Sequence, residues 1–177
     1  MSATLTSPSP EADAPDKDAA RFESLYRAHY GSILAYSQRR FPERADDIVA
    51  ETFLIAWRRL DFVPDDALPW LYGVARRVLS DSRRTTKRQG ALAERLIGSV
   101  RLEHRSSPPL ADSELAQALA ALPECERELI RLVYWEDLEP ARAAHAAGCS
   151  RAAAATRLWR ARRRLRAELR RMRGEEE

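Results

Sequence analysis

Hydrophobic side chains recur at steps of three and four residues along most of this chain, which is the spacing of one helix face. The first run begins at Phe22, and Pro42 interrupts the chain after it. A second run extends from about Glu43 to Leu60, and a third begins near Trp70. No segment alternates polar and apolar residues as a half-buried strand does. The pattern therefore predicts an all-α protein that begins with three helices.

The following segment differs from these runs in composition. Residues 89–112 contain glycines and the pair Pro108–Pro109 but few apolar residues, and they predict a flexible linker with at most one marginal helix. Ser113 then stands where it can cap a new helix, and Pro123 stands where the next helix would begin. We therefore expect two small helical domains joined by a linker.

A helix-turn-helix is predicted near the C-terminal end. Gly148 can adopt the positive φ of a tight turn, and Ser150 can cap the second helix. Ala144 and Ala147 keep the first helix thin where the second crosses it. The opposite face of the second helix carries arginines, which suits a DNA groove, although a solvated surface helix has the same composition. The inward stripe of this helix is Ala154, Leu158, Ala161, Leu165 and Leu169.

A second basic surface lies upstream, on the third predicted helix. Basic residues from Arg76 to Arg88 follow the face opposite to the apolar one, and they suit either phosphates or bulk solvent. Two aromatic residues stand at the start of this helix. We expect Trp70 to close the domain core and Tyr72 to be the better candidate for stacking on an exposed base.

Charge is distributed unevenly, although the net charge is only +3. Residues 11–18 are mostly acidic, whereas residues 151–173 carry ten arginines against one glutamate. This polarity indicates a polyanionic partner at the C-terminal end.

Several other classes of protein are disfavoured by what the sequence lacks. It has no apolar run of about 18 residues that could span a membrane and no basic start followed by an apolar stretch, as a secretory signal has. Cys125 and Cys149 do not form a CxxC pair. The carboxylates of the second helix have no accompanying cluster of His, Lys or Ser side chains. We therefore expect a cytoplasmic protein without enzymatic activity, cofactor or metal.

Three segments stand out in combination: ADDIVAETFLIAWRR (residues 45–59), PWLYGVARRVLSDSRR (residues 69–84), and ALAALPECERELIRL (residues 118–132) with the helix-turn-helix after it. In this order and at this spacing, from Phe22 to Leu169, they resemble the bacterial RNA polymerase sigma factors of the extracytoplasmic-function type. The first segment is similar to the family's core-binding segment, the second to its promoter −10 helix and the third to its −35 domain.

The resemblance implies two domains with known roles. Residues 20–89 would be sigma region 2, which binds core polymerase and recognises and melts the −10 element. Residues 113–173 would be sigma region 4, which recognises the −35 element. Composition adds a disordered acidic tail at residues 1–19, the linker at residues 90–112 and an acidic end at residues 174–177.

The resemblance also implies which residues make the contacts. The positions that match core-polymerase binding are Asp47, Ile48, Glu51, Phe53 and Leu54. The loop from Asp61 to Pro69 matches the segment that captures an unstacked −10 base. With Tyr72, Lys87 and Arg88 from the basic helix, the −10 candidates are Tyr72, Arg76, Arg77, Ser80, Arg83, Arg84, Lys87 and Arg88. The −35 candidates are Arg151, Ala152, Ala155, Thr156, Arg157, Arg160 and Arg163.

This chain departs from the family pattern at a few of these positions. Ala50 replaces a common Gln, Arg77 replaces a frequent Asn, and residues 153–155 are alanines where the family tends to have Thr-Val-Lys. Alanine cannot make the bidentate base contacts that are worth about 1–3 kcal/mol each. We therefore predict a relaxed reading of the −35 element that is dominated by phosphate contacts.

The partners implied by the resemblance are core RNA polymerase, through its clamp coiled coil and flap, and promoter DNA. Family members are often held by an anti-sigma protein that covers the same surfaces. Two alternatives are a stand-alone helix-turn-helix regulator and a degenerate sigma-like protein that binds partners without promoter recognition. A nucleic-acid-processing enzyme is disfavoured by the missing catalytic cluster.

The linker limits how the two domains can be arranged. Two promoter elements about two helical turns apart lie roughly 70 Å from each other. About 24 linker residues span about 80 Å when extended but only about 27 Å as a relaxed coil. We therefore expect a nearly straight linker in the promoter complex and two domains that lie closer together in the free protein.

Overall fold

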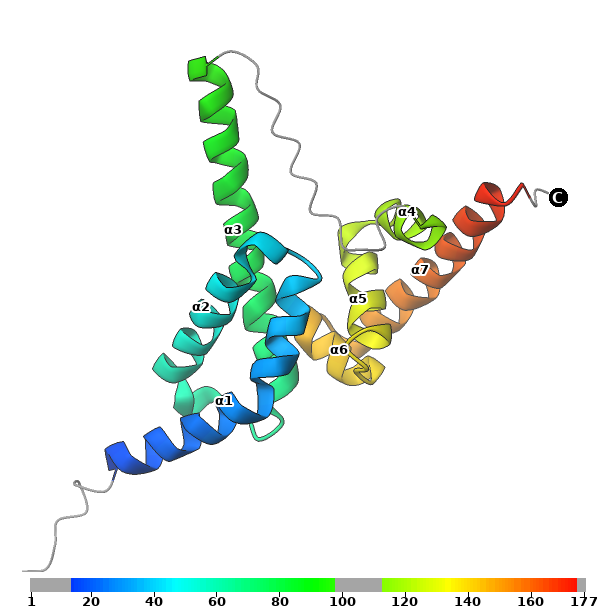
Figure 1. Ribbon diagram of the computed structural model, residues 1–177. Coiled ribbons are helices and arrows are strands. Elements are labelled where there is room, and N and C mark those ends of the chain that lie inside the picture. Colours follow the sequence, from blue (N-terminus) through cyan, green and yellow to red (C-terminus); the bar gives the residue numbers. More distant parts are fainter. Residues whose placement is uncertain (1–13, 98–112, 175–177) are drawn as a thin grey trace, which may run out of the picture.

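The computed structural model describes residues 14–97 and 113–174, and every regular element within them is helical (Figure 1). The prediction of an all-α protein with two domains is confirmed. The predicted tail up to residue 13, the linker from residue 98 and the acidic end from residue 175 lie outside the described residues. The N-terminal domain comprises α1 (Ala14–Gln38), the 3-10 turn η2 (Pro42–Arg44), α2 (Ala45–Arg58), the 3-10 turn η3 (Leu60–Phe62) and α3 (Ala67–Ile97). The C-terminal domain comprises α4 (Glu114–Ala120), α5 (Glu124–Tyr134), α6 (Pro140–Ala147) and α7 (Arg151–Met172).

The three helices of the N-terminal domain enclose an apolar core made of side chains from the helical pattern. Ile33 of α1, Ile48 of α2 and Leu71 of α3 are completely buried. Burying such a side chain stabilises the fold by about 1.5–3 kcal/mol relative to leaving it exposed. Trp70 lies partly buried against this core, as predicted. The core holds α1, α2 and the first turns of α3 as one unit.

Helix α1 begins at Ala14, inside the segment 1–19 that composition predicted to be a disordered tail, so that boundary was wrong. Pro15 is tolerated there because the first N–H groups of a helix have no intrahelical partner. Asp18 is favourable near the positive end of the helix dipole.

Helix α3 continues to Ile97, although the linker was predicted to begin at residue 90. Gly90 does not end the helix, because one glycine in a helix interior costs only about 1 kcal/mol relative to alanine. The residues that follow it, ALAERLI, include strong helix formers. The far end of α3 therefore projects away from the rest of the N-terminal domain (Figure 1).

The C-terminal domain follows the predicted caps and turns. The Ser113 hydroxyl accepts a hydrogen bond from the N–H of Ala116 (3.2 Å) at the start of α4. Helix α5 begins directly after Pro123. Its Leu129 and Leu132 are buried in the same core as Leu158 of α7. This core fixes the angle at which α7 leaves the domain.

The two domains lie against each other. Helix α6 packs on α3, and the end of α1 approaches α5 (Figure 1). The buried apolar side chains of the two domains form one continuous cluster. This arrangement agrees with the expectation that the domains of the free protein lie closer together than two promoter elements.

Candidate nucleic-acid interface

Helix α7 is positioned by a turn that has the predicted geometry. Gly148 has φ 68° and ends α6, and its N–H donates to the carbonyl of His145 (3.0 Å). The Ser150 hydroxyl then accepts a hydrogen bond from the N–H of Ala153 (3.2 Å) and caps α7. Ala154, Leu158 and Ala161 are buried as predicted. The opposite face of α7 is thereby presented to solvent.

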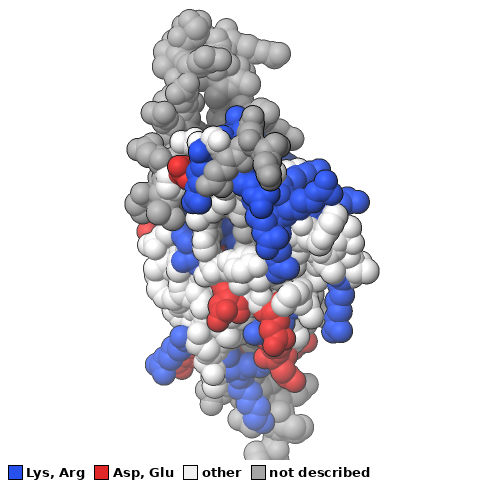
Figure 2. All heavy atoms as spheres, turned by 90° about the vertical axis from the view of Figure 1, so that its right-hand side faces the viewer, with Lys and Arg blue, Asp and Glu red and all other residues white. Residues whose placement is uncertain are grey.

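The predicted −35 residues lie on this outward face. Arg157 is half-buried because it borders the inward stripe. The remaining candidates are exposed: Arg151, Ala152, Ala155, Thr156, Arg160 and Arg163. Figure 2 shows the side of the molecule that carries the end of α7, on which Lys and Arg side chains gather above a smaller acidic patch. Such a surface attracts phosphates over a distance of about one Debye length.

Trp159 is a surface residue of α7 that the helical pattern did not single out. Its side chain is 60% exposed, and the guanidinium of Arg163 lies 5.7 Å from the centre of its ring. Tyr134, which is 58% exposed, accepts a hydrogen bond from Nε of Arg162 (2.9 Å). The available signal was the position of Trp159 one helical turn after Ala155, on the face that was predicted to meet DNA.

The −10 candidates on α3 are placed less uniformly. Arg77, Arg83 and Arg84 are exposed, and Ser80 is half-buried. Lys87 and Arg88 belong to α3, but their side chains lie outside the described part of the structure. Two further candidates, Tyr72 and Arg76, face the C-terminal domain.

Tyr72 is only 3% exposed, contrary to its expected role as an accessible stacking residue. Its ring lies 5.1 Å from that of Tyr36, a typical distance for aromatic packing. Burial and the nearby charge of Glu136 raise the pKa of Tyr72 to about 12. In this arrangement Tyr72 is a packing residue, because its ring is buried against Tyr36 of α1.

The loop between α2 and α3 exposes a different aromatic side chain. Phe62 is 78% exposed, while Leu60, Val63 and Ala67 of the same segment are buried. Nη2 of Arg21 donates a hydrogen bond to the carbonyl oxygen of Val63 (3.0 Å), which attaches the loop to α1. Phe62 therefore projects from a fixed segment into solvent. Its position inside the loop matched to base capture was the signal that could have identified it.

The surface expected to bind core polymerase lies on α2. Asp47 and Glu51 are exposed, and Leu54 is 41% exposed. Ile48 and Phe53 are buried, at 0% and 3% exposure, which corrects the expectation that they contact a partner directly. They face inward because the helical repeat places them on the side of α2 that packs against α1 and α3.

Aromatic side chains extend this α2 surface. Trp57 is 44% exposed and Tyr26 is 39% exposed. The ring of Phe22 lies 5.1 Å from that of Trp57, and the rings of Tyr26 and Phe53 are 4.8 Å apart. The result is an apolar patch next to the carboxylates of Asp47 and Glu51. The sequence predicted the acidic part of this surface and missed the aromatic part.

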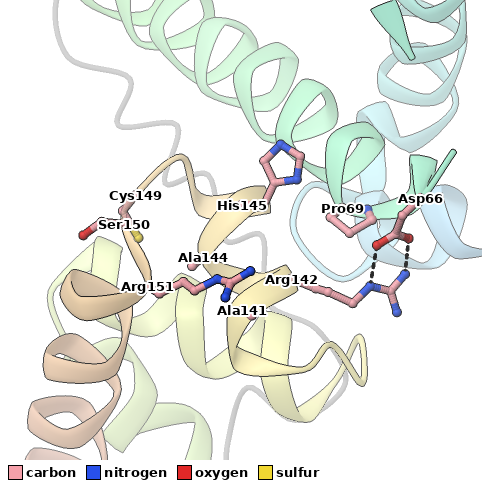
Figure 3. Close-up of a pocket in the computed structure, with 9 residues that line it drawn as sticks. All are labelled: Asp66, Pro69, Ala141, Arg142, Ala144, His145, Cys149, Ser150 and Arg151. Carbon is pink, nitrogen blue, oxygen red and sulfur yellow. Dashed lines mark hydrogen bonds and ion pairs between the residues drawn. The ribbon is translucent and has the colours of Figure 1, made fainter. Parts of the chain in front are cut away.

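A cleft of about 440 Å³ lies between the segment that precedes α3 and the helix-turn-helix (Figure 3). The Arg142 guanidinium spans the cleft and donates two hydrogen bonds to the Asp66 carboxylate, from Nε (2.9 Å) and from Nη2 (2.5 Å). In Figure 3 these two side chains point toward each other from α6 and from the segment before α3. The residues that line the cleft are Asp66, Pro69, Ala141, Arg142, Ala144, His145, Cys149, Ser150 and Arg151.

Within residues 14–97 and 113–174, no group of three or more His, Cys, Asp or Glu side chains is arranged to hold a metal ion. None of the helices in these two ranges has a stretch that is long and apolar enough to cross a membrane.

The arrangement of two helical domains agrees with comparisons to known proteins. Residues 25–89 match the family model of sigma-70 region 2, and residues 112–165 match that of sigma-70 region 4. The chain is 33% identical over 169 residues to the RNA polymerase sigma factor NccH of Alcaligenes xylosoxydans xylosoxydans, covering 88% of this chain and 90% of the relative. It is 30% identical over 165 residues to the ECF RNA polymerase sigma factor SigL of Mycobacterium tuberculosis, covering 86% and 90%.

Solved structures show the same fold. The structure of CnrH in complex with the cytosolic domain of CnrY is similar with a TM-score of 0.57 and 28% identity, covering 84% of this chain and 86% of that chain. The structure of RpoE in complex with the anti-sigma factor NepR from Bartonella quintana has a TM-score of 0.62 at 23% identity, covering 84% and 96%. With both sigma regions matched in order, this chain belongs to the sigma-70 family as an extracytoplasmic-function sigma factor.

Proposed function

We propose that this sigma factor docks on core RNA polymerase through α2 and directs initiation by reading the −35 element with α7 and the −10 element with α3 and the preceding loop. The observation that carries the proposal is the presentation of α7. Its apolar stripe is buried, its start is capped by Ser150, and its outward face carries the arginines predicted to meet DNA. A helix-turn-helix places its second helix in the major groove in this way.

Docking on polymerase is assigned to the exposed patch of α2 and α1. The carboxylates of Asp47 and Glu51 would meet cationic groups, and Leu54, Trp57 and Tyr26 supply apolar area beside them. Exposed aromatic groups that border charges are typical of binding surfaces. Ile48 and Phe53 support this patch from beneath.

Recognition of the −10 element is assigned to the loop and the exposed side of α3. Extruding a base costs a few kcal/mol, and stacking of that base on an aromatic ring offsets about 1–3 kcal/mol of this cost. Phe62 is the exposed ring in the loop and takes the stacking role that was expected of Tyr72. Arg77 and Arg84 are exposed on α3 and would contact the phosphates of the strand.

Recognition of the −35 element is assigned to α7 with little base-specific hydrogen bonding. Ala152 and Ala155 can touch thymine methyl groups but cannot donate to bases. Arg160 and Arg163 serve phosphates, and Trp159 adds apolar contact on the same face. Transcription from a library of −35 substitutions should vary weakly at most positions, and a sharp penalty at most of them would contradict this reading.

The chain contributes recognition and strand opening, and the polymerase carries out the chemistry in the cytoplasm. A protein inhibitor is a further candidate partner, since the similar structures of CnrH and of RpoE were each solved with a bound partner, which for RpoE is an anti-sigma factor. The exposed apolar patch of α1 and α2 is the surface that such an inhibitor would cover to block docking on polymerase.

Run-off transcription with purified core polymerase over genomic fragments tests the proposal. We expect initiation at discrete sites only when the protein is added, and loss of that activity in a Leu54→Glu, Trp57→Glu variant, which places charge in the docking patch. Tight sequence-specific binding to duplex DNA without polymerase, together with no initiation in its presence, would instead support a stand-alone regulator.

A further inference from the structure

Tyr134 is the last residue of α5, and its ring stays in solvent beside α7. The residues before it on α5 are packed: Leu132 is 1% exposed, and Val133 lies partly buried against the core. Helices α5 and α7 lie against each other within the same small domain (Figure 1). The end of α5 therefore holds an aromatic side chain at a fixed place on the surface that borders the DNA-facing helix.

The partner of Tyr134 is Arg162, an exposed residue of α7 that was not among the predicted −35 contacts. Nε of Arg162 donates a hydrogen bond to the phenolic oxygen of Tyr134 (2.9 Å), and its guanidinium carbon lies 5.7 Å from the centre of the ring. In this bond the tyrosine is the acceptor, so its own O–H can still donate. The guanidinium likewise keeps the N–H groups of Nη1 and Nη2. The pair therefore offers several donors from two helices at one place.

The positive charge of Arg162 distinguishes it from neighbouring arginines of α7. Arg164 pairs with Oε1 of Glu126 (2.9 Å), and Arg171 pairs with Oε1 of Glu168 (2.6 Å). Among the side chains that the structure describes, no carboxylate forms an ion pair with Arg162. A neutral phenol satisfies one N–H group but leaves the charge uncompensated. A phosphate oxygen accepts hydrogen bonds and carries the opposite charge, and a guanidinium binds it with two parallel N–H groups.

The position of Arg162 on α7 brings this pair close to DNA. Ala155, Trp159 and Arg162 stand at i, i+4 and i+7, so they form one row along the helix. Ala155 is a predicted base contact, and Arg162 lies about 10 Å further along the helix axis. The major groove is about 12 Å wide. A side chain that far from the base contact reaches the edge of the groove, where the phosphates of the backbone lie.

We propose that Tyr134 and Arg162 together form a binding site for one backbone phosphate at the edge of the −35 element, so that α5 as well as α7 contacts the promoter. The inference rests on the proposed function, because that function places α7 in the major groove. Tyr134 orients the guanidinium before DNA arrives, which reduces the side-chain freedom lost on binding, and donates its own O–H to the phosphate. Such a contact fixes the position of the helix on the duplex without reading sequence. It therefore supplies affinity that the alanines at residues 153–155 cannot supply through bases.

Phosphate-ethylation interference on the holoenzyme tests the site. The probe is a duplex that carries a promoter identified by run-off transcription, bound by core polymerase with the full-length protein. In the wild type, ethylation at one phosphate beside the −35 element should interfere with binding. In Arg162→Ala this position should no longer interfere, while the other interfering positions remain. Arg171→Ala is the matched control, because it removes the same charge from α7 but from a residue that pairs with Glu168, and it should keep the wild-type pattern.

Tyr134→Phe separates the hydroxyl from the ring. It keeps the apolar surface and the charge of Arg162 but removes a hydrogen bond that involves a charged group, and it should weaken binding of the closed promoter complex by about tenfold. The slope of log K against log salt concentration should stay at the wild-type value in this variant. In Arg162→Ala the slope should fall by about 0.9, the contribution of one phosphate. The urea midpoint of Tyr134→Phe should equal that of the wild type, since the side chain is exposed.

An interference pattern that is the same in the wild type and in Arg162→Ala would overturn the site. An equal decrease of the salt slope in Arg171→Ala would overturn it as well, because any arginine of α7 would then act alike. Weaker assembly with core polymerase at an unchanged interference pattern would assign the pair to a protein contact, and a lowered urea midpoint with that pattern would make it purely structural. Failure of the proposed function looks different, because the wild-type holoenzyme itself would then show no interference beside a −35 element.

Discussion

The two helices assigned to DNA, α7 and α3, differ in what covers them. The outward face of α7 is exposed along its length, and only its apolar stripe packs on the domain that carries it. Helix α3 has Arg77 and Arg84 in solvent, but Tyr72 is buried against Tyr36, and Arg76 faces the turn at Gly148. The residue types on a predicted DNA-binding helix are therefore not enough to say whether its side chains are accessible to DNA, because tertiary packing sets that accessibility.

The largest expected effect comes from removing the support of α7. Leu158→Ala truncates a side chain that is 3% exposed and should lower the free energy of unfolding by about 2–5 kcal/mol, measured in urea. The neighbouring Trp159→Ala is the control, since that side chain is 60% exposed and its loss should change stability by less than about 0.5 kcal/mol while weakening −35 DNA binding. Similar losses of stability in the two variants would mean that α7 is packed differently.

A substitution in the turn before α7 should have a smaller effect on stability. Gly148→Ala forces a side chain into the left-handed region at φ 68° and should cost about 1–2 kcal/mol of unfolding free energy. Gly31→Ala is the matched control, because Gly31 lies within α1 with no atom near its Cβ position and should stabilise by about 0.5–1 kcal/mol. A stabilising Gly148→Ala would show that this turn is not the one described.

The salt dependence of DNA binding can show, without polymerase, whether residues of α7 and of α3 contact phosphates in the free protein. For binding of the free protein to nonspecific duplex DNA, Arg160→Ala should reduce the slope of log K against log salt concentration by about 0.9, the contribution of one phosphate contact. Arg76→Ala should leave the slope unchanged, because Arg76 faces the helix-turn-helix. An equal decrease for Arg76→Ala would show that the covered side of α3 is accessible in the free protein.

The smallest expected effect is a pH dependence near the domain interface. Burial lowers the pKa of His29, the nearby charge of Asp66 opposes this shift, and Arg142 adds to it. Because the folded state disfavours the protonated imidazole, its contribution to stability is complete above the unfolded pKa of about 6.5 and decreases as the pH falls below it. The urea midpoint of the wild type should therefore fall more between about pH 7.5 and pH 5.5 than that of His29→Gln. Parallel curves would contradict this assignment.

Much of the fold followed from local patterns. The turn at Gly148, the caps at Ser113 and Ser150 and the buried stripe that includes Leu158 were all predicted and are all present. The errors concern the extent of helices and the exposure of side chains. Helix α3 passes through Gly90 because neighbouring helix formers offset the glycine, and a helix period alone could not tell that Tyr72 is covered and Phe62 is not.

The sequence by itself determined the helices, their caps and the order of two sigma regions, because these depend on residues only a few positions apart. Only the tertiary structure decided which DNA-facing residues are available. The pairing of Arg40 with Glu128 and Glu136 joins distant parts of the chain, and no local sequence pattern predicts it. Buried charges are satisfied by whatever the fold brings beside them, so their partners become known only once the domains are packed.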